Sequence, residues 1–143
     1  MSNNNRFIDN GDGTVTDTEK NLMWKKTDSM NDLKKWVNYQ DSADYARSLN
    51  EEKFAGYENW RLPTRDELST IYDKAWSIKD RFDKDIHIHE CFATGGGFSM
   101  IANQVPGRMR TWVLNIRDGE YTQPDGLWTL AEAARAVRSI INR

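Results

Sequence analysis

The segment from Asn59 to Leu68 constrains the fold of this chain more than any other stretch of its 143 residues. Thr64 and Glu67 have the spacing of a capping box, in which the threonine hydroxyl accepts a hydrogen bond from the Glu67 N–H and the carboxylate accepts one from the Thr64 N–H. We therefore expect a helix to begin here, with Pro63 packing against Leu68 at its start. An apolar stripe with helical spacing follows, formed by Leu68, Ile71, Tyr72 and Ala75.

Two turn pairs open the chain. Asn10-Gly11 and Asp12-Gly13 lie inside the β-favouring stretch Phe7–Asp17, and such pairs are the strongest short-range signal of a hairpin. After a polar turn, the apolar run Leu22-Met23-Trp24 predicts a third strand. The first part of the chain therefore predicts a hairpin followed by one more strand.

The middle of the chain gives weaker signals. From Asp41 to the Ala55-Gly56 pair the spacing of apolar residues predicts a helix, whereas the segment Met30–Tyr39 favours no single type of element. The charged segment Ser77–Glu90 predicts a loop. The glycine-containing segment Ala93–Arg110 predicts a long excursion rather than a packed element, and long ordered loops often carry function.

Towards the C-terminus the sequence predicts a second hairpin. Thr111–Arg117 has the alternation of a strand, and the Asp118-Gly119 turn leads into Glu120-Tyr121-Thr122. Beyond it the type of element stays open. Thr129 and Glu132 have capping-box spacing in an alanine-rich stretch that favours a helix, but the residues from Ala134 also permit a strand.

Composition limits the function classes. The chain has the size of one domain, and we expect a disordered N-terminus at 1–6 and a single domain at 7–143. Twenty basic and 22 acidic residues give a charge of −2, which favours neither nucleic acid nor a membrane as partner. Because the start of the sequence lacks an export signal and Cys91 is the only cysteine, we expect a cytoplasmic protein.

The motifs quoted so far resemble those of the Lcl C-terminal domain family, a domain of unknown function. The resemblance rests on Phe7–Asp17, Leu22–Trp24, Ala55–Thr64 and Trp112–Gly119. It implies an α+β fold of the C-type-lectin-like superfold shared with formylglycine-generating enzymes, with an N-terminal β-hairpin, two helices and a small antiparallel sheet with long loops. It also implies that Ala136-Val137-Arg138 is the final strand, with room for a short helix at Leu130–Ala133.

His87, His89 and Cys91 form the sharpest candidate for a metal site. On a strand, alternate side chains share one face, so the three side chains can converge on zinc or a similar ion. A loop that leads into a strand, with Cys91 buried, explains the same residues without metal. We predict neither a bound metal nor a cofactor. We also expect no catalysis. Formylglycine-generating chemistry in the resembled superfold relies on a pair of cysteines, and Cys91 is the only cysteine of this chain.

The preferred binding surface lies on two loops, the excursion Ala93–Arg110 and the segment Gln123–Trp128. Arg108 and Arg110 can hold an anionic group by paired hydrogen bonds, and Trp128 offers an apolar face. The motif Trp60, Arg61, Leu62, Pro63, Thr64 and Glu67 is expected to be structural, with Arg61 bracing the corner before the helix.

These observations favour a noncatalytic binding module that recognises a protein or an anionic ligand through long loops. One alternative is a metal-binding protein or metal-dependent enzyme with its site at His87, His89 and Cys91. The other is a structural or assembly subunit, in which case a homo-oligomer is expected, because the aromatic content suits a buried interface.

Overall fold

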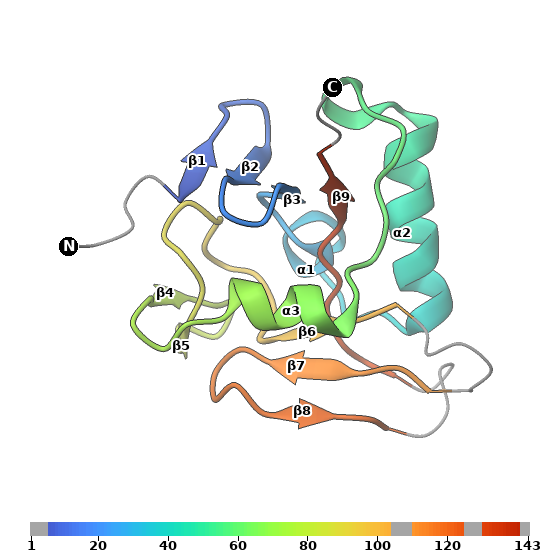
Figure 1. Cartoon of the computed structure of the whole chain (residues 1–143). Helices are drawn as coiled ribbons and strands as arrows, with labels where there is room; N and C mark the ends of the chain where they lie inside the picture. Colours follow the sequence, from blue (N-terminus) through green and yellow to red (C-terminus); the bar gives the residue numbers. More distant parts are fainter. Residues whose placement is uncertain (1–5, 104–109, 125–129, 141–143) are drawn as a thin grey trace.

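The computed structural model describes residues 6–103, 110–124 and 130–140. Within these ranges the chain is a mixed α/β structure with three α-helices and three small antiparallel sheets (Figure 1). The predicted mixture of helices and antiparallel strands is therefore confirmed. Among the helices of the described ranges, none has the length and apolar character needed to cross a bilayer.

The largest sheet unites the first strands with the last one. Its order is β1 (Phe7–Asp9), β2 (Thr14–Asp17), β3 (Leu22–Lys25) and β9 (Val137–Ser139), all antiparallel (Figure 1). Gly11 and Gly13 have φ angles of 80° and 91°, a left-handed conformation that costs glycine little, and they form the turn between β1 and β2. The predicted hairpin and third strand are confirmed.

The C-terminal segment, where the sequence permitted helix or strand, is extended. Val137 pairs with Trp24 of β3 on one side and bridges the chain before α3 on the other, pairings that a helix would lose. The strand implied by the family resemblance is therefore confirmed. The short helix at Leu130–Ala133 is wrong, because Glu132 exchanges backbone hydrogen bonds of 2.8 and 3.0 Å with Val37.

The α-helices are α1 (Ser29–Leu33), α2 (Tyr39–Glu51) and α3 (Arg65–Ile71), and a 3₁₀ turn covers Phe54–Gly56. The family resemblance implied two helices, and α1 is additional, within the segment that the sequence left untyped. Helix α2 begins at Tyr39 rather than Asp41. Asn38 caps it, because its side chain accepts a hydrogen bond of 2.8 Å from the Asp41 N–H.

The capping box predicted for α3 is present. The Glu67 N–H donates to Thr64 Oγ1 at 3.2 Å, and the Thr64 N–H donates to Glu67 Oε1 at 2.9 Å. The helix nevertheless ends at Ile71, so the prediction that its apolar stripe continues to Ala75 is wrong. Tyr72 adopts an extended backbone conformation, which turns the chain away from the helix axis.

The remaining strands form two smaller sheets. One has the order β6 (Ser99–Ile101), β7 (Val113–Asn115) and β8 (Tyr121–Thr122), and the other pairs β4 (Ile78–Lys79) with β5 (Asp85–Ile86). The predicted β7–β8 hairpin is confirmed. Two other predictions were wrong. The sequence favoured an unpacked excursion in the region of β6, but this strand is buried. It also favoured a loop in the region where β4 and β5 form a hairpin.

Two apolar clusters form the core. One gathers around Trp24, which is fully buried, and the other includes Trp60 and Leu62, which are 3% and 4% exposed. The structural role predicted for the Trp60–Thr64 motif is therefore supported. Arg6, which the sequence placed in a disordered N-terminus, is bound instead, because its guanidinium donates to both oxygens of the buried Asp17 at 3.0 and 2.8 Å.

Candidate functional site

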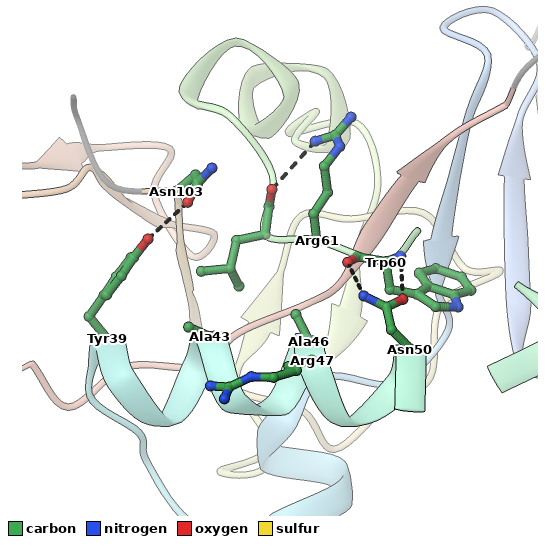
Figure 2. Close-up of a pocket in the computed structure, with 9 residues that line it drawn as sticks. Tyr39, Ala43, Ala46, Arg47, Asn50, Trp60, Arg61 and Asn103 are labelled. Carbon is green, nitrogen blue, oxygen red and sulfur yellow. Dashed lines mark hydrogen bonds between the residues drawn. The ribbon is translucent and has the colours of Figure 1, made fainter. Parts of the chain in front are cut away.

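A groove of about 230 Å³ lies between α2 and the segment Trp60–Leu62, which we call the groove from here on (Figure 2). Ala43 and Ala46 face it from α2, and their methyl side chains leave room that longer residues would fill. Trp60 and Leu62 supply apolar surface on the opposite side. The groove therefore owes its shape to small residues on a helix set against a buried aromatic segment.

Asn50 fixes the segment opposite α2. Its side-chain amide donates to the Trp60 carbonyl at 2.9 Å, and its amide oxygen accepts from the Trp60 N–H at 2.7 Å (Figure 2). The indole N–H of Trp60 donates to the Phe54 carbonyl at 3.1 Å. Every polar group that Trp60 turns towards this region is thus bonded, and the wall of the groove is rigid.

Arg61 braces the corner where the motif meets α3. Its guanidinium donates to Glu67 Oε1 and Oε2 at 2.7 and 2.8 Å and to Ser139 Oγ at 2.7 Å. Hydrogen bonding to Glu67 raises the pKa of Arg61. Burial acts to raise the pKa of Glu67, but the hydrogen bonds from Arg61 and Thr64 outweigh it and hold that pKa below its ordinary value. The predicted bracing role of Arg61 is confirmed.

Asn103 connects the groove to the excursion predicted as a binding loop. Its N–H donates to the Pro63 carbonyl at 2.7 Å, and its side-chain oxygen accepts from the Tyr39 hydroxyl at 2.8 Å (Figure 2). The Thr111 hydroxyl lies within 2.6 and 2.8 Å of the Ala102 and Asn103 carbonyls, so it closes the base of the excursion. The described ends of this loop therefore meet at the edge of the groove.

The predicted ligand residues are only partly placed. Arg110 is exposed and precedes Thr111 at the base of the excursion. Arg108 and Trp128 lie outside the described residues. Sequence reasoning did not identify the groove, although both of its walls contain predicted elements.

Arg47 is the cation with most freedom at this site. Its side chain is 58% exposed, and its partner is Asp44, one turn earlier on the same helix and 50% exposed. The groove is lined by two arginines and no acidic residue among the described side chains that form it. Each guanidinium has a carboxylate partner, Glu67 for Arg61 and Asp44 for Arg47, and the Arg47 pair is the more exposed of the two.

The predicted metal site does not assemble from a strand face. Strand β5 ends at Ile86, and His87 Nδ1 donates to the Trp76 carbonyl at 2.8 Å. His89 Nδ1 accepts the Cys91 N–H at 3.0 Å. Among residues 6–103, 110–124 and 130–140, no three His, Cys, Asp or Glu side chains are grouped to hold an ion. The premise that the three side chains share one strand face is wrong.

Cys91 lacks the environment of a nucleophile. Burial raises the pKa of its thiol, and its sulfur lies 3.7 Å from the Phe7 carbonyl. Burial also lowers the pKa of His89, whose ring packs against Phe7 at 4.9 Å between centroids. Burial therefore disfavours the thiolate, which is the nucleophilic form of a cysteine.

The aspartates near the start of the chain serve turns and an ion pair. Asp9 Oδ1 accepts the Gly11 N–H at 3.0 Å, and Asp12 Oδ1 accepts the Thr14 N–H at 3.1 Å. Hydrogen bonding to Lys26 lowers the pKa of Asp9. These contacts assign both aspartates to the turn between β1 and β2.

The glycines at 95–97 allow close packing. The Gly97 N–H donates to the buried Asp28 carboxylate at 2.8 Å. A Cβ at Gly96 would lie 2.7 Å from the same carboxylate, and one at Gly97 would lie 2.6 Å from the Ala133 Cβ. The tight backbone path expected here is confirmed.

Arg135 was missed by sequence reasoning. It is 1% exposed, and its Nη1 donates to the Lys25 and Lys26 carbonyls at 3.0 and 2.6 Å. Its Nη2 lies 3.9 Å from the Asp28 carboxylate, and burial lowers its pKa. Nothing local in the alanine-rich stretch distinguishes this arginine from Arg138, which also lies in it. Arg135 is enclosed within the core, where its Nε has no hydrogen-bond partner among the described residues.

The features described above define a small mixed α/β domain with a groove beside its longest helix. The sequence matches the Lcl C-terminal domain family over residues 13–138, and the chain belongs to this family. No curated protein matches the chain, and no solved structure does. The resemblance inferred from the sequence motifs is therefore confirmed.

Proposed function

We propose that the chain is a noncatalytic binding domain that recognises an anionic group, on a small ligand or on a protein, in the groove. The observation that carries the proposal is the lining of the groove, which contains Arg47 and Arg61 without an acidic residue. An anion that enters meets two guanidinium groups, and Arg47 can leave its exposed partner Asp44 at small cost.

The rest of the site suits a binding role. The rigid apolar wall at Trp60 and Leu62 gives a ligand a surface to bury, and the Tyr39–Asn103 hydrogen bond joins α2 to the excursion. Arg110, at the base of the excursion, supplies a further exposed cation. Such an arrangement binds by preorganised contacts and needs no reactive group.

The frame and location are part of the proposal. A C-type-lectin-like frame is supported by the sheet that joins β1, β2 and β3 to β9, and by loops carried on the β6–β8 sheet. A cytoplasmic location is supported by the single cysteine, which cannot form an internal disulfide. A noncatalytic role is supported by the burial of Cys91, which raises the pKa of its thiol.

Nuclear magnetic resonance titration of the ¹⁵N-labelled chain tests the groove. With acetate, inorganic phosphate and inorganic sulfate as probes, we expect saturable shift changes gathered at Arg47, Asn50 and Asn103. Arg47→Gln should abolish them, whereas Lys20→Gln, which removes an exposed cation outside the groove, should not. Shifts scattered over surface lysines, or shifts that persist in Arg47→Gln, would overturn the proposal.

A further inference from the structure

Three aromatic side chains form a surface cluster outside the groove, and we call Trp36, Phe82 and Phe98 the aromatic patch. The rings of Trp36 and Phe82 are 18° apart in plane with centroids at 6.3 Å, and Phe98 packs edge-on against Trp36 at 4.9 Å. They come from the segment after α1, the β4–β5 turn and the segment before β6. Phe82 is 49% exposed, compared with 47% for Ile8 and 42% for Leu33, the other exposed large apolar residues in the described ranges.

The β4–β5 turn holds Phe82 at the surface. Asp80 is 4% exposed, and its Oδ1 accepts the N–H groups of Phe82 and Lys84 at 2.8 and 3.0 Å. The Arg81 N–H donates to the Gly96 carbonyl at 2.8 Å, which attaches the turn to the segment before β6. The exposed ring is thus presented on a fixed turn, and little conformational entropy is lost when a partner covers it.

Arg117 completes the support of the patch. Its Nε and Nη2 lie 2.9 and 2.8 Å from Asp80 Oδ2, and its guanidinium carbon lies 4.1 Å from the centre of the Phe98 ring. A buried carboxylate therefore balances this charge. Arg117 braces the aromatic rings and adds no net charge to the surface.

Basic side chains flank the patch in the sequence. Lys34 and Lys35 precede Trp36, and Arg81 and Lys84 surround Phe82; all four are exposed, and we call them the basic flank. None of the four forms an ion pair with another residue of the described ranges. Within two residues of the patch the only exposed acidic residue is Asp83, so this region is positive on a chain whose net charge is −2.

We infer that the aromatic patch is a docking surface for an acidic segment of a partner protein that carries an aromatic or aliphatic side chain. The apolar side chain packs on Phe82 and Trp36, where burial of apolar surface supplies affinity. The carboxylates of the segment face the basic flank, which steers the encounter and selects against basic partners. This surface is separate from the groove, and the inference does not depend on the proposed function.

Selection from a random peptide display library against the immobilised full chain tests this inference. We expect enriched peptides to combine Asp or Glu with a Phe, Tyr, Trp or Leu. A synthetic copy of an enriched peptide should bind Phe82→Ala and the double variant Arg81→Glu/Lys84→Glu at least about tenfold more weakly in fluorescence anisotropy. Binding to the unaltered chain should weaken as salt is raised, because the charges of the basic flank are exposed.

Matched variants control the experiment. Ile8→Ala removes a similarly exposed apolar side chain, and Lys20→Glu reverses an exposed charge elsewhere; both should keep the affinity. Failure to enrich any peptide, enrichment of neutral or basic peptides, or unchanged affinity in Phe82→Ala would overturn the inference. A dimer in light scattering that Phe82→Ala dissociates would also overturn it, in favour of a second copy of the chain. Arg47→Gln should leave peptide binding intact, so failure at the groove and failure at the patch remain distinguishable.

Discussion

Arg61 and Arg135 place the same guanidinium group in two contrasting environments. Arg61 is partly exposed at the edge of the groove and forms a bidentate pair with Glu67 at 2.7 and 2.8 Å. Arg135 is 1% exposed, and it donates to the Lys25 and Lys26 carbonyls at the end of β3, with the Asp28 carboxylate at 3.9 Å. The first arginine braces the wall of the groove, and the second holds together segments that are distant in the sequence.

The two arginines differ in their exposure to solvent. An exposed pair is screened and contributes little to stability, whereas removal of one partner from a buried pair leaves an uncompensated charge. We therefore expect the domain to depend on the Arg135–Asp28 region for stability and to tolerate changes at the Arg61–Glu67 corner. Four measurements of stability test this expectation.

The largest effect is expected from Arg135→Ala. Loss of the guanidinium leaves Asp28 buried without its cation and removes a donor from the Lys25 and Lys26 carbonyls, so the free energy of unfolding should fall by about 3–5 kcal/mol. Urea unfolding measures this change. Lys20→Ala, at an exposed side chain, should alter stability by less than about 0.5 kcal/mol. A loss in Arg135→Ala no larger than in this control would contradict the assigned role.

Gly97→Ala should have the next largest effect. The added Cβ would lie 2.6 Å from the Ala133 Cβ and 3.1 Å from the Trp36 ring. Such overpacking costs about 1–3 kcal/mol. Differential scanning calorimetry should show a lower melting temperature, and the second change Ala133→Gly should recover part of it. No recovery in the double variant would show that this contact is not the cause.

Thr64→Ala should cost about 1 kcal/mol of stability, because the N-terminal N–H groups of α3 lose their side-chain acceptor. Thr64→Ser keeps the hydroxyl and should stay close to the unaltered chain in the same urea unfolding experiment. Equal losses for the two variants would show that the methyl group, not the cap, stabilises this corner.

The smallest effect concerns pH at Glu67. Its pKa lies below the ordinary value of 4.5 in the folded chain, so the Arg61–Glu67 pair stabilises the fold above pH 4.5 and loses this contribution as pH falls through the lowered pKa. Glu67→Gln should therefore be destabilised at neutral pH, by less than about 1 kcal/mol. The difference from the unaltered chain should shrink in acid. Asp66→Asn, at a side chain that is 97% exposed, should show no such pH-dependent difference.

The structure places some sequence-predicted candidates together and separates others. The Trp60–Thr64 motif and the α2 stripe were both expected as structural elements, and their packing makes the groove. Nothing in the sequence shows that Asn103 would bind the Pro63 carbonyl and bring the excursion to its edge. Conversely, His87, His89 and Cys91 are close in sequence, but the strand that would align them ends at Ile86.

The sequence by itself determined the first hairpin, the β7–β8 hairpin, the cap of α3 and the family of the chain. Turn and cap signals act within a few residues, through backbone conformation and short-range hydrogen bonds, so a local pattern suffices to predict them. After Ala134 the local pattern left helix and strand open and the family resemblance implied the strand, whereas the pairing of β9 with β3 and the burial of Arg135 emerge from the tertiary structure alone. The physical reason is that backbone pairing with β3 and the desolvation of a charged side chain depend on segments more than one hundred residues away in sequence.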